Sequence, residues 1–185
     1  MNFNPIFERN PSPDDDEPDF RPPKHLPTEI LPGLYLGDYD NATDTTWLMK
    51  HNVLHILNIS GTGYHPQWEK LFIKDVPLVY SLQIWDTSDQ KISPYFDECI
   101  KFIDKGLLHG SVLVHCQLGI SRSPSIIIAY LLEKKFLIGY HEALSYVKER
   151  RRMVSVNDGF RRQLIQYYNS TYYFQKLKDI SFLEN

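Results

Sequence analysis

Short apolar runs punctuate the chain from Glu29 onward, and their lengths are those of strands. The runs cover four to seven residues each and are rich in Val, Ile, Leu and Tyr, which favours strands over helices. One of them, Val53–Ile59, is apolar enough to be buried on both faces of a sheet. The predicted strands are Ile30–Leu36, Val53–Ile59, Leu71–Val76, Leu82–Trp85 and Ser111–His115.

Helical spacing of apolar positions fills most of the intervals between these runs. The clearest helix begins at Ser93-Pro94 and places Phe96, Cys99, Ile100 and Ile103 on one face, with Gly106 as the expected stop. Strands that alternate with helices predict an α/β fold in which helices cover a central sheet. The other predicted helices are Thr43–His51, Ser123–Lys135, His141–Arg152 and Gly159 to about Phe174.

The first 27 residues follow neither pattern. They hold seven of the chain's 12 prolines and the acidic run Asp14–Glu17, with six acidic residues against three basic ones. Because such a segment buries little apolar surface, we expect a disordered acidic tail over residues 1–27. A solvated leader is the favoured interpretation, and a partner-binding arm is the alternative. The predicted folded domain covers residues 28–178, followed by a C-terminal tail at 179–185.

Composition narrows the class of protein. The 185 residues are 42% hydrophobic, which suffices for one domain with a sizeable core, and the net charge of -3 gives no pull toward nucleic acid. No apolar stretch is long enough to cross a membrane. The two cysteines form no disulfide framework, which is typical of a reducing compartment. We therefore expect a soluble protein of the cytoplasm, the nucleus or both.

Candidate chemistry gathers where the strand Ser111–His115 meets the helix that follows. Cys116 and Arg122 are separated by five residues, a loop length that can curl around one phosphate. Backbone N–H groups at the start of a helix form a nest for such an anion, and Gly119 gives the loop its conformational freedom. The sulfur would lie at the base of the loop, with the Arg122 guanidinium as a bidentate clamp.

A cysteine at a helix N-terminus and near an arginine can have a lowered pKa, and Cys116 would then be a thiolate ready to attack phosphorus. The alternative is that Cys116 is a small core residue, as cysteine often is. The combination of His115, Cys116, Gly119, Arg122 and Ser123 at a strand-to-helix junction favours the catalytic interpretation. Cys99, in contrast, lies on the apolar face of a predicted helix and is expected to be a core residue, with a redox partner for Cys116 as the minority interpretation.

The sequence His115-Cys116-x-x-Gly119-x-x-Arg122-Ser123 resembles the signature of the cysteine-dependent protein tyrosine phosphatases, in the small or atypical dual-specificity branch. Further segments resemble the opening strand (ILPGLYLG), the first buried strand (NVLHILNIS), the acid loop and the closing turn of that family; the last two are Asp86–Ile92 and Val156–Phe160. The resemblance covers about residues 28–172. It implies a central, mostly parallel twisted sheet of about five strands flanked by helices.

By this resemblance, catalysis proceeds in two steps through a phosphocysteine formed on Cys116, with no metal or cofactor. Asp86 would donate a proton to the leaving group, Ser123 would hydrogen-bond the sulfur, and His115 would hold the loop. The amides from Gln117 to Arg122 would bind the phosphate together with the Arg122 side chain. The implied substrate-binding positions are Gln117, Leu118, Gly119, Ile120, Ser121 and Arg122.

The acid has two candidates. The spacing to Ile92 and Phe96 favours Asp86, whereas the stretch upstream of it is about five residues longer than is usual in the family, which leaves Asp89 as the second candidate. Asn157 is expected to hold the neighbouring loop through side-chain-to-backbone bonds, and an ordinary turn residue is an equal alternative.

Phosphorylated proteins are the expected partners. The positions between Cys116 and Arg122 carry no Lys or Arg, unlike those of inositol-lipid phosphatases of this superfamily. Two alternatives stay open: a phosphoprotein-binding module without turnover, and a phosphatase for non-protein phosphate esters. The run Glu149–Arg152 is expected to be a solvated helix end, with a patch for acidic partners as the alternative. The oligomeric state is not predicted.

Overall fold

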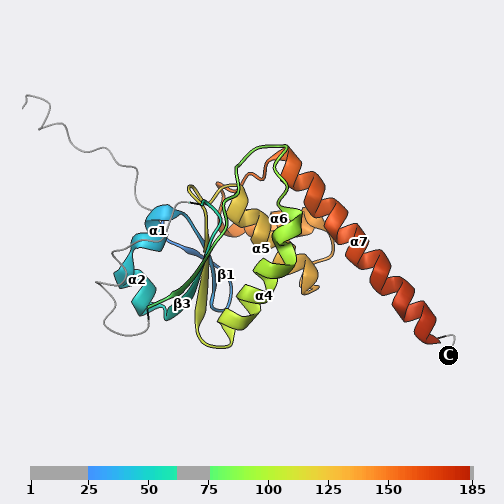
Figure 1. Cartoon of the computed structure of the whole chain (residues 1–185), viewed down its shortest axis with the longest axis horizontal. Coiled ribbons are helices and arrows are strands. Elements are labelled where there is room, and N and C mark those ends of the chain that lie inside the picture. The colour runs from blue at the N-terminus through green and yellow to red at the C-terminus, as the bar shows by residue number, and fades with distance from the viewer. Residues whose placement is uncertain (1–24, 62–75, 184–185) are drawn as a thin grey trace, which may run out of the picture.

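The computed structural model describes residues 25–61 and 76–183, and at its centre lies a twisted sheet of five strands (Figure 1). The strand order is β1-β2-β5-β3-β4, with β1 antiparallel to β2 and the other pairs parallel. The mostly parallel α/β fold is therefore confirmed. The strands are β1 (Thr28–Leu31), β2 (Leu34–Gly37), β3 (Val53–Asn58), β4 (Leu78–Ser81) and β5 (Ser111–His115).

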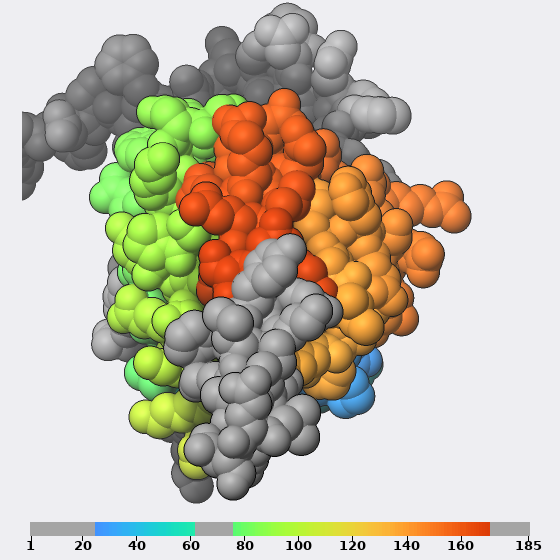
Figure 2. All heavy atoms as spheres, turned by 90° about the vertical axis from the view of Figure 1, so that its right-hand side faces the viewer, coloured from blue at the N-terminus to red at the C-terminus, as the bar shows by residue number. Residues whose placement is uncertain are grey.

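Helices cover both faces of this sheet. Two short helices, α1 (Tyr39–Thr43) and α2 (Thr45–Lys50), lie on one face, and the longer helices lie on the other (Figure 1). In Figure 2, α7 lies between α4 and α6 on the exposed side of this layer. The longer helices are α4 (Phe96–Leu107), preceded by the 3-10 turn η2 (Ser93–Tyr95), and α5 (Arg122–Glu133), α6 (Tyr140–Arg150) and α7 (Asp158–Leu183).

The most buried elements are β5 and α5, which follow one another in the chain. Every residue of β5 is buried, and so are ten of the twelve residues of α5. A helix that is apolar all round must be enclosed by other elements, and α5 packs between the sheet and the helices α4, α6 and α7. The loop that joins β5 to α5 is therefore held at both ends by the best-packed part of the molecule.

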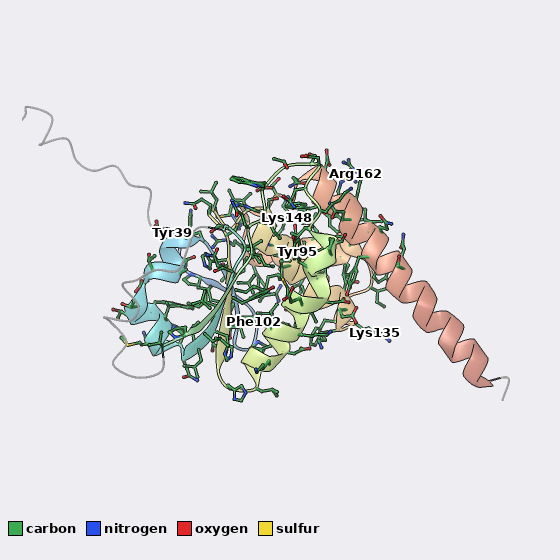
Figure 3. The ribbon with its side chains drawn as sticks, in the orientation of Figure 1. Tyr39, Tyr95, Phe102, Lys135, Lys148 and Arg162 are labelled. Carbon is green, nitrogen blue, oxygen red and sulfur yellow. The ribbon has the colours of Figure 1, made fainter. Side chains whose placement is uncertain are left out.

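The face of α4 that packs on the sheet is the predicted one. Phe96, Cys99, Ile100 and Ile103 are all buried. The ring centroid of Phe102, on the same helix (Figure 3), lies 5.6 Å from those of His55 in β3 and Tyr80 in β4. Phe102 therefore packs against the two strands at this edge of the sheet.

Two strand predictions are wrong in detail. The expected strand Ile30–Leu36 is two strands, because Pro32 and Gly33 form a turn in which Gly33 has a φ of +77° that favours glycine. The expected strand Leu82–Trp85 is instead β4 at Leu78–Ser81, and only a single bridge joins Gln83 to Ser60. Of the expected strand Leu71–Val76, residues 71–75 lie outside the described residues, and Val76 is not in a strand.

Three helix predictions also need correction. The expected helix Thr43–His51 is split at Asp44, which caps α2 with its carboxylate. Gly106 does not stop α4; it is buried inside the helix, where a Cβ would lie 2.6 Å from the Val112 side chain. The last helix starts at Asp158 and extends to Leu183, beyond the expected end near Phe174.

The expected acidic tail and the expected lack of a membrane span can be compared only with the described residues. Residues 1–24 of the expected acidic tail lie outside the described residues, as do residues 184–185 at the other end. Over the described ranges, no helix combines the length and the apolar character that a membrane span needs.

Candidate active site

The loop from Cys116 to Arg122, called the anion loop below, lies at the carboxyl end of β5. This strand is the central one of the sheet, between β2 and β3. The carboxyl ends of parallel strands are where α/β proteins place their ligands, and α5 begins at Arg122 with its N-terminal amides directed back at the loop. Fold and local sequence therefore converge on one anion-binding position.

Cys116 lies at the base of the anion loop. Its Sγ accepts a hydrogen bond from the Gly119 backbone N–H at 3.3 Å and another from the Ser123 hydroxyl at 3.2 Å. Gly119 has a φ of +65°, and a Cβ there would lie 2.7 Å from the Gly37 carbonyl oxygen. Glycine is thus required twice, by the backbone conformation and by the close approach of β2. Both donors fix the position of the sulfur at the base of the loop.

Donors from outside both the anion loop and α5 hold the Gln117, Gly119 and Ile120 carbonyls in the middle of the loop. The Gln117 carbonyl accepts from the Tyr39 N–H at 3.3 Å, and the Ile120 carbonyl accepts from the Ser155 N–H at 2.8 Å. The Gly119 carbonyl accepts from the Arg151 side chain at 3.2 Å. Because the C=O and N–H of a trans peptide point in opposite directions, each of these contacts turns the next N–H toward the inside of the loop.

The Arg122 side chain spans the anion loop and the segment after β4. Its Nη1 donates to the Ile84 carbonyl at 3.2 Å, and its Nε lies 3.9 Å from Asp86 Oδ2. This Nε is buried and has no hydrogen-bond partner among the described residues. A buried guanidinium N–H without a partner costs free energy, so it is a donor available to a bound oxyanion.

Asp86 is fixed by two donors that both reach its Oδ1. The Ser121 hydroxyl donates at 2.6 Å and the Asn157 side-chain amide donates at 2.7 Å. The Ser121 oxygen in turn accepts from the Asn157 backbone N–H at 3.2 Å. With Oδ1 occupied by these two donors, Oδ2 is the oxygen that faces Arg122.

Asp89 has no comparable position. It is exposed, and a hydrogen bond from the Thr87 side chain holds its pKa below the ordinary value. Asp86, in contrast, contacts Ser121 and Arg122 of the anion loop. The geometry therefore favours Asp86 over Asp89 as the general acid.

The acid loop, residues 86–92, is anchored on α7. Gln163 accepts from the backbone N–H groups of Ile92 at 2.8 Å and Ser93 at 3.1 Å, and its amide donates to the Gln90 carbonyl at 2.8 Å. Gly159 lets the loop approach closely, because a Cβ there would lie 2.0 Å from the Ser88 carbonyl oxygen. Asp86 is thus positioned from both ends of its loop.

His115 and Cys99 complete the predicted set. His115 is buried at the end of β5, and its Nδ1 lies 3.3 Å from the Cys116 carbonyl oxygen, beside the anion loop. Cys99 is a free thiol buried in α4, and burial raises its pKa to about 12. It is a core residue, as expected.

Two large apolar side chains, one in the anion loop and one next to Asp86 in the chain, are exposed. Leu118 in the loop is 60% exposed, and Trp85 beside Asp86 is 63% exposed. Gln117 is also exposed, whereas Gly119 and Ser121 are buried. Large exposed apolar side chains beside a polar site provide contact area for the group that carries the phosphate.

Sequence reasoning missed three contributors. Ser121 was expected only among the phosphate-binding amides, yet its hydroxyl holds Asp86. Asn157 makes one of the expected side-chain-to-backbone bonds, accepting from the Phe160 N–H at 2.9 Å, but it holds the acid loop through the Asp86 side chain. Arg151, expected to be part of a solvated helix end, is 4% exposed and contacts the anion loop. A buried arginine inside a run of three has no sequence signal that separates it from its neighbours.

No group of three or more His, Cys, Asp or Glu side chains suited to a metal ion occurs in the described part of the chain. The buried donors here, which are backbone N–H groups and the Arg122 guanidinium, are chemically suited to an anion.

Comparisons with known proteins identify the family of this chain. The family "Dual specificity phosphatase, catalytic domain" matches residues 34–170. Human dual specificity protein phosphatase 5 is 42% identical over 146 residues, which are 76% of this chain and 35% of that protein. The chain therefore spans about a third of the length of this relative.

Two solved structures share the fold. The crystal structure of DUSP15 is 32% identical with a TM-score of 0.70, covering 83% of this chain and 96% of that one. The human tyrosine phosphatase-like serine/threonine/tyrosine-interacting protein is 37% identical with a TM-score of 0.67, covering 80% and 97%.

Proposed function

Because this chain belongs to the dual specificity phosphatase catalytic-domain family, we propose that it is a cysteine-dependent protein phosphatase that hydrolyses phosphotyrosine and phosphoserine or phosphothreonine in proteins. One observation carries the proposal above the others. Cys116 Sγ, the buried Arg122 Nε and the Asp86 Oδ2 that lies 3.9 Å from this Nε belong to one constellation at the carboxyl edge of the sheet.

In the first step, the Cys116 sulfur attacks the phosphorus of a bound phosphate monoester. A sulfur–phosphorus bond forms while the bond from phosphorus to the ester oxygen breaks. Asp86 gives the proton on its Oδ2 to that departing oxygen, so the substrate leaves as an alcohol or a phenol. The loop amides and Arg122 stabilise the charge on the three remaining oxygens.

In the second step, a water molecule attacks the phosphocysteine. Asp86, now a carboxylate, takes a proton from that water, while the Ser123 hydroxyl donates to the leaving Cys116 sulfur. Inorganic phosphate is released and Asp86 is protonated again. All of the groups in both steps are side chains or amides of this chain.

The substrate class is inferred from the rim of the anion loop. Between Cys116 and Arg122 no side chain carries a positive charge that could meet a second phosphate of an inositol lipid. The exposed Leu118 and Trp85 instead offer apolar contact to the body of a phosphorylated residue. We therefore place phosphoproteins ahead of other phosphate esters.

Phosphate release from a substrate panel tests this function. The panel holds phosphotyrosine, phosphothreonine and doubly phosphorylated peptides, phosphoinositides and 5′-triphosphate RNA, with Cys116→Ser as the control variant. We expect turnover of the peptides that is lost in Cys116→Ser. Turnover of only the lipids or the RNA would overturn the substrate class, and binding of the peptides without any turnover would make the protein a phosphoprotein-binding module.

A further inference from the structure

We propose that Arg151 is a positioning residue for the anion loop: by holding the Gly119 carbonyl, it aims the Ile120 N–H at the bound phosphate. This inference rests on the proposed function, since it concerns how the same loop binds its anion. The Arg151 Nε donates to the Gly119 carbonyl oxygen at 3.2 Å. No interaction of Arg151 with substrate is required.

The first argument is the geometry of the peptide between Gly119 and Ile120. Its carbonyl points out of the anion loop toward Arg151, so its N–H points the opposite way, into the loop. The Gln117 and Ile120 carbonyls are held by the backbone N–H groups of Tyr39 and Ser155. The Gly119 carbonyl, in contrast, is held by the side chain of Arg151.

The second argument is the burial of the Arg151 guanidinium. It is 4% exposed, and its Nη2 donates to Asp38 Oδ2 at 3.2 Å while its Nη1 donates to the Leu26 carbonyl at 3.4 Å. Each of the three guanidinium nitrogens thus donates to an acceptor on a different segment, which the planar fork of arginine makes possible. A lysine in this place has one ammonium group and cannot reproduce that arrangement.

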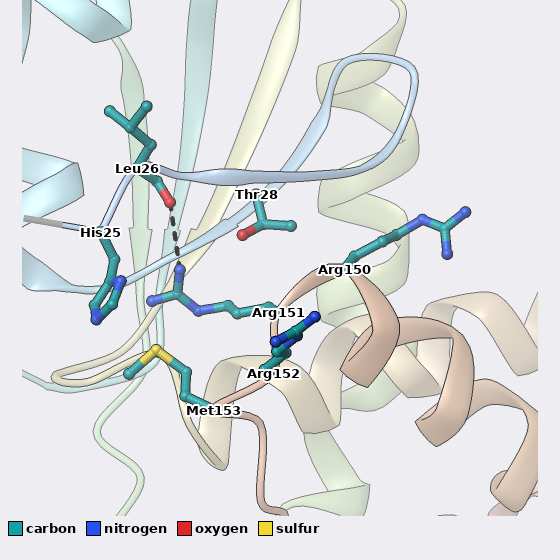
Figure 4. A pocket seen from close by; sticks show the side chains of 7 residues that line it. All are labelled: His25, Leu26, Thr28, Arg150, Arg151, Arg152 and Met153. Atoms are coloured by element: carbon teal, nitrogen blue, oxygen red, sulfur yellow. Dashed lines mark hydrogen bonds between the residues drawn. The ribbon is translucent and has the colours of Figure 1, made fainter.

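The third argument is the contrast with the adjacent arginines. In Figure 4, the Arg151 side chain extends beneath Leu26, whereas Arg150 points away from it. The Arg150 guanidinium stacks 3.5 Å from the Tyr146 ring centroid, and Arg152 is exposed. These residues border a cavity of about 350 Å³, of which Arg151 forms the inner wall toward the anion loop.

Asp38 supplies the partner charge at the right place. It follows β2 directly, and Gly37 at the end of β2 is paired with His115 at the end of β5. The Asp38 carboxylate also caps α1 through the Asn41 N–H at 3.0 Å. Asp38 is therefore held in place by β2 and α1, which both lie beside the anion loop. Its ion pair with Arg151 fixes the position of the guanidinium that donates to the Gly119 carbonyl.

The experiment measures anion binding rather than turnover. Tungstate affinity is determined by calorimetry for the wild type, Arg151→Lys and the double variant Asp38→Asn/Arg151→Met, which leaves no buried charge unpaired. Arg152→Met is the matched control. Thermal unfolding establishes that each variant is folded. We expect tungstate affinity to fall about 10- to 100-fold in the double variant and several-fold in Arg151→Lys, with no change in Arg152→Met.

A second readout separates positioning from the loss of a positive charge. In a ¹⁵N-labelled protein, the Ile120 amide resonance should shift on tungstate binding in the wild type and shift far less in Arg151→Lys, which keeps the charge. Wild-type affinity and an unaltered Ile120 shift in Arg151→Lys would overturn the inference. A wild type that binds neither tungstate nor phosphate would instead overturn the proposed function.

Discussion

The Ser121 hydroxyl lies 2.6 Å from Asp86 Oδ1, and this contact joins the loop of the nucleophile to the loop of the acid. The contact thereby fixes the position of these two loops, which are distant in the sequence, relative to each other. The relationship makes Ser121 more than a spacer before Arg122, because its side chain holds the Asp86 carboxylate in its orientation.

Removing the Ser121 hydroxyl should therefore slow the first step of the reaction, in which Asp86 protonates the departing oxygen. For Ser121→Ala we expect kcat/KM to fall about 3- to 10-fold with phosphothreonine peptides, the worth of one hydrogen bond. Aryl phosphates with good leaving groups should be hydrolysed almost as before. Steady-state kinetics over a series of leaving groups measures this difference, and an equal loss for all substrates would contradict it.

Asp86→Asn should remove the acid while keeping the shape of the side chain. We expect turnover of phosphothreonine peptides to fall about 10²- to 10⁴-fold. Asp89→Asn is the matched control and should leave turnover unchanged, since Asp89 is exposed on the same loop. If Asp89→Asn were the damaging change, the role of the acid would pass to Asp89.

Ser123→Ala should slow the breakdown of the phosphocysteine. Because the Ser123 hydroxyl donates to Cys116 Sγ, its loss makes the sulfur a poorer leaving group in the second step. We expect a burst of product followed by turnover that is about 10- to 100-fold slower, the range for losing one donor to a charged atom. Rapid-quench kinetics detects the burst. Ser125→Ala on the same helix should show none, as its hydroxyl bonds the Ser121 carbonyl instead.

Gln163→Ala should loosen the acid loop from α7. Three hydrogen bonds between the Gln163 side chain and residues 90–93 are lost, which should cost about 1–3 kcal/mol of stability. We also expect kcat to fall while tungstate affinity is retained, because the anion loop is not touched. Urea unfolding and calorimetry provide these values. Gln166→Ala, at an exposed position of α7, should behave as the wild type.

His55 should make the fold sensitive to acid. Burial lowers the pKa of this imidazole below the ordinary 6.5, helped by the nearby His109 and Lys105. His55 therefore binds a proton more readily in the unfolded chain than in the folded one. The contribution of the neutral His55 to the free energy of unfolding is fully present above pH 6.5 and is lost as pH falls below that value. His55→Phe should reduce the difference in unfolding free energy between pH 7.5 and pH 5.5. An unchanged difference would show that other groups cause the acid sensitivity.

The sequence predicts the parts of this molecule that local rules govern. Strand β5, helix α5 and the junction between them follow from apolar runs and from Gly119, and Cys116 and Arg122 are where the spacing places them. Periodicity could not show the turn at Gly33 that splits the first strand, because a turn of two residues leaves the apolar pattern intact.

What the sequence does not reveal are contacts made across long separations. Ser121 and Asp86 are 35 residues apart, and Gln163 and Ile92 are 71 apart. Arg151 has the same sequence character as Arg150 and Arg152, yet the backbone turn after α6 buries only this one of the three. Tertiary packing, rather than residue type, assigns these roles.

The anchoring of the acid loop on α7 has a consequence for the order in which the protein becomes active during its synthesis. The chain leaves the ribosome with Cys116 and Arg122 well before Asn157 and Gln163, which fix the acid. A nascent chain that ends after α6 would carry the nucleophile without an oriented proton donor. The domain would therefore be able to turn over substrate only after α7 has been synthesised and has folded.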